Sequence, residues 1–112
     1  MMRWFLAAAA ASLCLASSAS AAGPTLIIRQ TVADYAKWRP GYDAHKAVRT
    51  RAGLTNCRVQ STTDNVNDLF VICDMADVAK AKAFTSSKNL AEAMTKAGVV
   101  GKPEFFFLAA AR

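Results

Sequence analysis

Two segments that are apolar at successive positions constrain the fold of this chain more than any other feature. Residues 68–74 read DLFVICD, and residues 103–108 read PEFFFL. Successive side chains of a strand point to opposite faces of its sheet, so strands of this kind require cover on both faces. The helices of so small a domain can cover only one face, and a small soluble monomer rarely exposes a large apolar patch. We therefore expect helices on one face and, on the other, a second copy of the chain related by a twofold axis.

The other elements follow from strand, turn and capping signals. Strands are expected at residues 25–32 (TLIIRQTV) and 55–62 (TNCRVQST), with turn residues at 63–67 between the second of them and residues 68–74. Helices are predicted over residues 34–53, 77–86 and 87–97. Their ends are marked by three N-capping residues and two glycines, namely Asp34, Asp77, Ser87, Gly53 and Gly98.

The order β-α-β-β-α-β predicts an α+β domain of the ferredoxin-like type. Each β-α-β unit is a right-handed crossover, which places the helices of both units on one face of a four-stranded antiparallel sheet. We expect one such domain over residues 22–112, joined sheet to sheet to its second copy.

Pro40 lies inside the first predicted helix. A proline there removes a backbone hydrogen bond and disfavours helical geometry at the preceding residue, Arg39. We expect a short first turn over residues 34–38, then a bend, and a main helix that has Pro40 in its first turn. Such a bend would open the helix face into a shallow concavity.

Several segments resemble the dimeric α/β-barrel superfamily, whose ferredoxin-like subunits pack sheet against sheet. They are DYAKWRPGYDAHKAVRTRAGL at 34–54, DVAKAKAF at 77–84, LAEAM at 90–94 and KAGVVGKPE at 96–104. The resemblance covers about residues 25–108 and extends more remotely to the antibiotic-biosynthesis monooxygenase branch. It implies the fold and the homodimer. It implies no single activity, because relatives include cofactor-independent oxygenases, lactone isomerases and haem-degrading enzymes. The Asn, Trp and His set of the haem-degrading branch is not matched here position by position, and we predict no cofactor.

The first predicted helix carries aromatic and basic side chains along one face. Tyr35, Trp38, Tyr42, His45 and Arg49 follow spacings of three, four, three and four residues, which is one face of a helix. The aromatic residues either pack on the sheet as core or line a pocket between the helix and the sheet. Small-ligand sites are typically apolar pockets with a few convergent polar groups. We therefore take these five residues, which we call the stripe, as the candidate ligand-binding residues.

His45 is the only histidine and the one candidate catalytic residue. An imidazole ordinarily titrates near neutral pH, which suits a general acid or base. No second catalytic residue stands at a recognisable spacing, since Asp34 and Asp43 lie off the stripe and no serine has an elbow motif. A lone histidine provides no metal-ligand cluster, so we predict no metal site.

The cysteines suggest a disulfide. Cys14 lies in the N-terminal segment, which leaves Cys57 and Cys73 in the domain. If the hairpin is centred on Asn65, these two residues face each other across the strands. Facing Cβ atoms of antiparallel strands lie about 4.5–5.5 Å apart, close to disulfide reach. The alternative is a pair of buried thiols, which pack as small hydrophobic groups.

The N-terminal residues have the layout of a secretory signal peptide. Arg3 precedes an apolar run over residues 4–15, and residues 19–21 (ASA) form a small-residue cleavage site. The run has about a dozen residues, fewer than the roughly 20 that span a bilayer. We expect residues 1–21 to be removed and the domain to be periplasmic or secreted, without stable membrane insertion.

The distribution of charge argues against nucleic acid as a partner. The formal net charge is +6 at pH 7, but the basic residues are scattered and form no nucleic-acid-binding motif.

Three functions stay open. The chain is an exported homodimer that binds a small aromatic or amphipathic ligand, a cofactor-independent monooxygenase or isomerase with His45 as acid or base, or a structural protein with a filled core. We favour the first, because only one side chain of the stripe, the imidazole of His45, is of a type that ordinarily titrates near neutral pH.

Overall fold

The computed structural model describes residues 23–111, and the predicted signal peptide lies outside the described residues. In chain order its elements are β1 (Thr25–Val32), α1 (Tyr35–Ala44), α2 (Lys46–Arg51), β2 (Leu54–Ser61), β3 (Asp68–Met75), α3 (Val78–Thr85), α4 (Lys88–Ala97) and β4 (Val99–Leu108). None of the helices within this range is long and apolar enough to cross a membrane.

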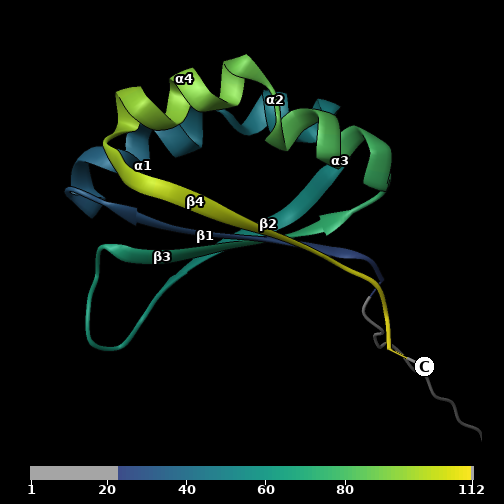
Figure 1. Cartoon of the computed structure of the whole chain (residues 1–112), viewed down its shortest axis with the longest axis horizontal. Helices are drawn as coiled ribbons and strands as arrows, with labels where there is room; N and C mark the ends of the chain where they lie inside the picture. Colours follow the sequence, from purple (N-terminus) through teal and green to yellow (C-terminus); the bar gives the residue numbers. More distant parts are fainter. Residues whose placement is uncertain (1–22, 112) are drawn as a thin grey trace, which may run out of the picture.

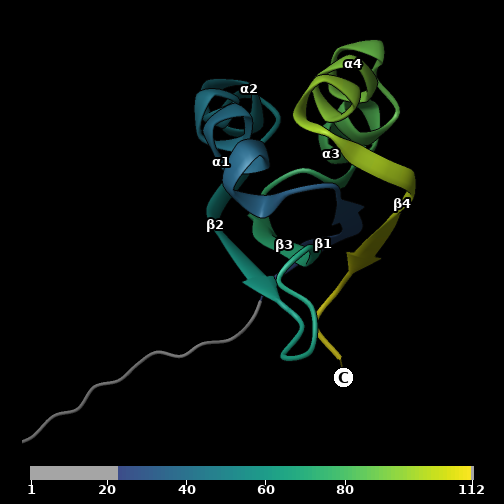
Figure 2. The ribbon, with the colours of Figure 1, turned by 90° about the vertical axis from the view of Figure 1, so that its left-hand side faces the viewer.

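The strands form one antiparallel sheet in the order β2-β3-β1-β4. All four helices lie over the same face of this sheet (Figure 1). They form two pairs, α1 with α2 and α3 with α4, which run side by side above the strands (Figure 2). The predicted ferredoxin-like arrangement is therefore confirmed.

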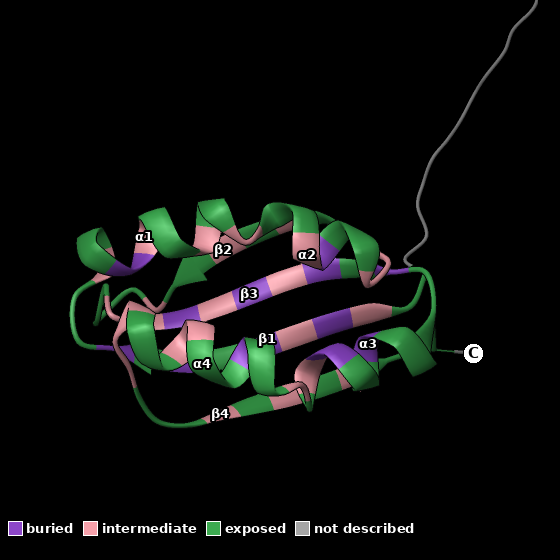
Figure 3. Cartoon of the chain, turned by 90° about the horizontal axis from the view of Figure 1, so that it is seen from above, coloured by how far each residue is buried: buried purple, intermediate pink, exposed green. Residues whose placement is uncertain are grey.

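The core lies between the helices and the two central strands. Leu26 and Ile28 of β1, with Leu69 and Val71 of β3, are at most 4% exposed. Buried positions alternate with more exposed ones along both strands, as Figure 3 shows in purple beneath the helices. This alternation identifies the helix-covered face of the sheet.

The structure confirms the predicted helix ends, which depend on interactions between residues close together in the sequence. The side chains of Asp34, Asp77 and Ser87 each accept a hydrogen bond from the backbone N–H three residues ahead, which satisfies a donor of the first helical turn. Gly53 and Gly98 follow α2 and α4 with φ angles of 79° and 88°, a left-handed conformation that favours glycine.

The prediction that Pro40 would break the first helix is wrong. Helix α1 continues through Pro40 to Ala44, and the interruption comes at His45, where α2 follows. A proline inside a helix costs about 3 kcal/mol. Packing opposes this cost, since Trp38 of the same helix is 3% exposed and its ring stacks on that of Tyr42.

Strands β2 and β3 pair in the predicted register. Val59 faces Val71, as expected for a hairpin centred on Asn65. A bulge lies between Thr55 and Arg58 of β2, the edge strand of the sheet.

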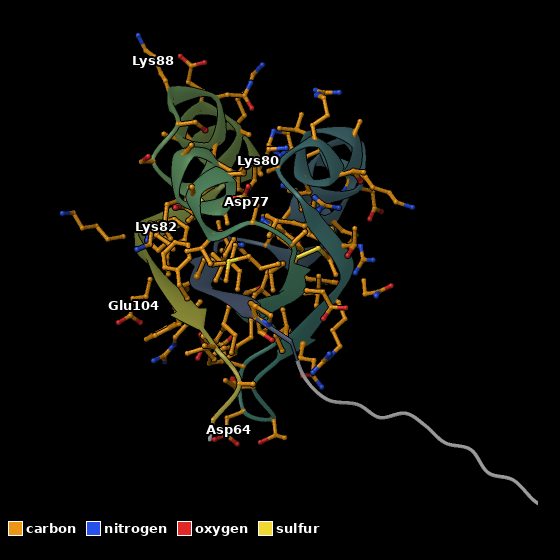
Figure 4. The ribbon with its side chains drawn as sticks, turned by 90° about the vertical axis from the view of Figure 1, so that its right-hand side faces the viewer. Asp64, Asp77, Lys80, Lys82, Lys88 and Glu104 are labelled. Carbon is orange, nitrogen blue, oxygen red and sulfur yellow. A yellow bond between two sulfur atoms is a disulfide. The ribbon has the colours of Figure 1, made fainter. Side chains whose placement is uncertain are left out.

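The structure joins Cys57 and Cys73 by a disulfide bond, with the two sulfur atoms 2.08 Å apart and the two Cα atoms 4.1 Å apart. The sulfur–sulfur bond appears in yellow in Figure 4. It links edge strand β2 to its neighbour β3.

No described element of the chain covers the face of the sheet opposite the helices. Ile27 lies between Ile72 of β3 and Phe106 of β4 in one row across this face. Phe106 and Leu108 are 43% and 44% exposed. The strands are thus apolar on both faces, as the sequence predicted, and the chain by itself covers one.

Candidate functional site

A cavity lies between the two helical pairs and the central strands, and we call it the inner cavity. Its apolar wall includes Ile28, Val71, Phe84, Leu90 and Met94. Its volume is about 50 Å³, which is room for a few water molecules. An apolar cavity that takes up benzene measures roughly 150 Å³, so a single aromatic ring would enter the inner cavity only if the walls moved apart.

Four of the five stripe residues line the inner cavity, namely Trp38, Tyr42, His45 and Arg49. Tyr35 does not line it. Its hydroxyl oxygen accepts a 2.8 Å hydrogen bond from Nη1 of Arg39. This bond is the main reason why the pKa of Arg39 is raised, although burial acts in the opposite direction.

The stripe is built around the ring of Tyr42. Trp38 is 3% exposed and stacks on Tyr42 with a centroid distance of 4.9 Å and an interplanar angle of 22°. Cζ of Arg49 lies 3.8 Å from the centroid of Tyr42, and its Nη1 donates a 2.7 Å hydrogen bond to the Tyr42 carbonyl. Burial raises the pKa of the Tyr42 phenol, while the positive charge of Arg49 opposes that shift.

His45 connects the two helical pairs. Nε2 of its ring lies 2.9 Å from Oδ1 of Asn89 on α4, and its ring centroid lies 6.0 Å from that of Phe84 on α3. An amide oxygen only accepts, so Nε2 of the imidazole is the donor in this contact. Asp34 caps α1 and Asp43 pairs with Arg39 at 3.0 Å, so neither carboxylate orients His45.

Gln30 is a cavity residue that the sequence analysis missed. It is 5% exposed and lines the inner cavity, and its Oε1 has no hydrogen-bond partner among residues 23–111. Nearly all buried polar atoms in native proteins have such a partner, so this oxygen lacks a hydrogen bond that a bound donor group could supply. The signal was present in the alternation of β1, where Gln30 follows Leu26 and Ile28 at the next inward position.

The inner cavity therefore offers an apolar interior with an amide acceptor, an imidazole and a guanidinium at its wall. These groups can position a small apolar molecule that carries a polar substituent. In the part of the chain that the structure describes, no three His, Cys, Asp or Glu side chains gather closely enough to hold a metal ion.

The fold has counterparts among solved structures. The cofactor-independent oxygenase SnoaB of Streptomyces nogalater is 18% identical, with a TM-score of 0.63 over 82% of this chain and 96% of that one. A Bordetella bronchiseptica protein assigned as an antibiotic biosynthesis monooxygenase is 14% identical, with a TM-score of 0.65 over 80% and 99% of the two chains. A Streptomyces coelicolor monooxygenase, in complex with nanaomycin D, is 14% identical, with a TM-score of 0.55 over 81% and 89%.

Sequence comparison adds nothing to these likenesses, because no protein-family model and no curated protein sequence matches the chain. At such low identities a structural likeness establishes the fold. The remote resemblance seen in the sequence is thus confirmed at that level, and the chain has the ferredoxin-like fold of antibiotic-biosynthesis-monooxygenase-like proteins.

Proposed function

We propose that this chain is an exported homodimeric domain whose inner cavity binds a small, mainly apolar ligand. The observation that carries the proposal is the inner cavity itself, an apolar space with Gln30, His45 and Arg49 in its wall. The unpartnered Oε1 of Gln30 supports a ligand with a hydrogen-bond donor, such as a hydroxyl or an N–H group. A ligand of one aromatic ring with such a substituent would satisfy both features once the walls of the cavity had moved apart.

Entry of the ligand requires the helical pairs to separate. The pairs are joined by the exposed contact between Asn89 and His45, which lines the cavity. A hydrogen bond of this kind contributes about 0.5–1.5 kcal/mol net, so it opens at small cost. The sheet stays intact during such a motion, because the helices are outside its hydrogen-bond ladder. His45 would then act as a latch over the bound ligand.

A second candidate function is a cofactor-independent oxygenase reaction, which the likeness to SnoaB favours. In this reading, Nδ1 of His45 removes a proton from the bound ligand, as a general base does. Turnover of a phenolic or quinol-like ligand with consumption of oxygen would support it. Binding of the same ligand without turnover would support the binding function and not the oxygenase function.

The binding proposal is tested by narrowing the inner cavity. Ala93 of α4 lines the cavity, and Ala93→Leu fills part of it. Ala79 of α3 is exposed, and Ala79→Leu is the matched control. A thermal-shift screen with phenol, indole and related single-ring compounds should give stabilisation in the wild type and Ala79→Leu. Ala93→Leu should lose it.

Equal stabilisation of all three proteins would show that the ligand binds elsewhere. A screen in which no single-ring compound stabilises the wild type would contradict the binding function and favour the structural alternative. Stabilisation by such compounds is expected because a ligand that binds only the folded state raises its stability.

The uncovered face of the sheet is proposed to pack on a second copy of the chain. Ile27, Phe70, Ile72, Phe106 and Leu108 form its apolar centre. Arg29 lies on the same face, 5.5 Å from the ring centroid of Phe70, and pairs with Glu104 at 3.8 Å. Two such faces, related by a twofold axis, would bury the apolar residues that a monomer exposes.

Export is proposed from the N-terminal pattern of residues 1–21. An oxidising compartment outside the cytoplasm would sustain a bond between Cys57 and Cys73. The mass of the mature chain tests export directly, and its free thiol content tests the disulfide.

A further inference from the structure

A second hollow lies on the outer side of α1 and α2, against edge strand β2, and we call it the outer groove. Its volume is about 390 Å³, within the range of about 300–1,000 Å³ that is usual for small-molecule sites. Its lining includes Arg39, Lys46, Arg49, Thr50, Asn56 and Cys57. Tyr42 and Arg49 line both the outer groove and the inner cavity, so this pair forms the partition between them.

Arg49 is a buried cation without a counter-charge. It is 7% exposed, and among residues 23–111 it forms no ion pair. Its Nη1 donates to the Tyr42 carbonyl, whereas its Nε and Nη2 donate to no residue in the same range. A charge taken out of water is costly unless it is paired and hydrogen-bonded. The free Nε and Nη2 edge therefore lacks the partner that such burial calls for.

The nearby carboxylate does not fill this role. Asp43 lines the outer groove, but its carboxylate accepts a 3.0 Å hydrogen bond from Nε of Arg39. Lys46 adds a further positive charge to the lining and forms no ion pair within the described chain. The outer groove thus has three cations and a single carboxylate, and that carboxylate is already engaged.

Strand β2 departs from regular strand geometry where it lines the outer groove. At the bulge of β2, Asn56 has a φ angle of 50°, in the left-handed region that residues other than glycine seldom adopt. Bulges occur more often than expected beside functional sites, where they change the direction of a side chain. The next residue, Cys57, is held to β3 by the disulfide, so this wall of the groove is fixed.

We propose that the outer groove binds a small organic acid, whose carboxylate pairs with the free Nε and Nη2 edge of Arg49 and is also attracted by Lys46. The planar fork of a guanidinium matches a carboxylate through two parallel hydrogen bonds. The ring of Tyr42 and the side chain of Leu54, both in the lining, offer apolar contact to the body of the acid. This site is separate from the inner cavity and does not depend on the ligand proposed there.

The test uses benzoate and its neutral analogue benzamide as probes of the mature protein. Nuclear magnetic resonance of ¹⁵N-labelled wild type follows the Nε–H signal of Arg49. Benzoate should shift this signal in a saturable titration in both the wild type and Ala93→Leu, whereas benzamide should not shift it in Ala93→Leu, whose inner cavity is narrowed. Arg49→Met should weaken benzoate binding about tenfold or more, as expected for a charge-assisted bidentate contact. The matched control Arg51→Met removes an exposed charge from the same helix and should leave the affinity unchanged.

Two further variants keep the test decisive. If Arg49→Met fails to fold, Lys46→Met at the exposed rim should still weaken benzoate binding severalfold. Ala93→Leu, which narrows the inner cavity, should leave it unchanged. Absence of a saturable shift at Arg49 would overturn the proposal. Equal effects of benzoate and benzamide in Ala93→Leu would also overturn it. So would equal losses in Arg49→Met and Arg51→Met, unaltered binding in Lys46→Met, or loss of benzoate binding in Ala93→Leu.

Discussion

The guanidinium of Arg49 lies over the ring of Tyr42, with Cζ 3.8 Å from the ring centroid, and one of its nitrogens donates to the Tyr42 carbonyl at 2.7 Å. The two residues come from different helices, α1 and α2, on either side of the interruption at His45. Because both line the inner cavity and the outer groove, they separate two spaces of different character. The inner cavity is mostly apolar, and the outer groove has most of the charge.

The stability of the ligand-free protein should show that Arg49 is placed for binding. Burial lowers the pKa of Arg49, so the folded state disfavours the charged form, and this penalty holds at every pH at which the guanidinium is charged. Arg49→Met, which fills a similar volume, should therefore be within about 1 kcal/mol of the wild type or more stable. Urea denaturation measures the difference. A loss of about 3 kcal/mol or more would make Arg49 a structural residue.

Trp38 is expected to be mainly structural. It is 3% exposed and stacked on Tyr42, so Trp38→Ala should cost about 3–5 kcal/mol of unfolding free energy, as large-to-small core changes do. His45→Ala should cost only about 0.5–1.5 kcal/mol, the net value of its hydrogen bond to Asn89. Thermal melts of both variants check this order. A His45→Ala variant as unstable as Trp38→Ala would show that His45 belongs to the core and does not act as a latch.

Local chemistry explains which parts of the fold could be predicted from the sequence. Capping by Asp34, Asp77 and Ser87 involves residues three positions apart, so the sequence pattern contains the whole interaction. The register of β2 and β3 also follows from a short turn. Pro40 was misjudged because its local preference was considered alone, whereas α1 is also held by tertiary packing, in which Trp38 is 3% exposed.

The candidate site was predictable only in part, because residues of both β-α-β units, which are far apart in the sequence, form its wall. The helical spacing was enough to group Trp38, Tyr42, His45 and Arg49. Nothing in it indicated that Leu90 and Met94 of α4 would close the opposite side. Arg49 also lines the outer groove. That groove depends on how α1 and α2 lie against β2, which the spacing of residues along a helix does not predict.

The disulfide is checked by intact mass before and after alkylation without reductant. We expect the unfolded mature chain to take up no alkyl group. Cys57 and Cys73 are separated by 16 positions, and closing a loop of this size stabilises a protein by about 3 kcal/mol. The double variant Cys57→Ala, Cys73→Ala should therefore lose about that much unfolding free energy. Uptake of two alkyl groups would show free thiols and would also weaken the case for export.

The homodimer is tested by sedimentation of the mature chain. We expect twice the monomer mass, since Phe106 and Leu108 are exposed in one copy. Phe106→Arg should produce monomers by placing a charge in the centre of the uncovered face. The matched control Val66→Arg changes an exposed apolar residue in the turn between β2 and β3 and should remain dimeric. A wild type that sediments as a monomer at micromolar concentration would refute the dimer.

The most direct test of the central claim, that the inner cavity is a ligand site, is a methyl-resolved nuclear magnetic resonance titration with indole or phenol. The methyl groups of Ile28, Val71, Leu90 and Met94 face this cavity from three elements. The account predicts saturable shifts of these four signals together, with little change at Ile72 on the opposite face of the sheet. Shifts confined to Ile72 and its neighbours, or no saturable shift at the four cavity methyls, would contradict it.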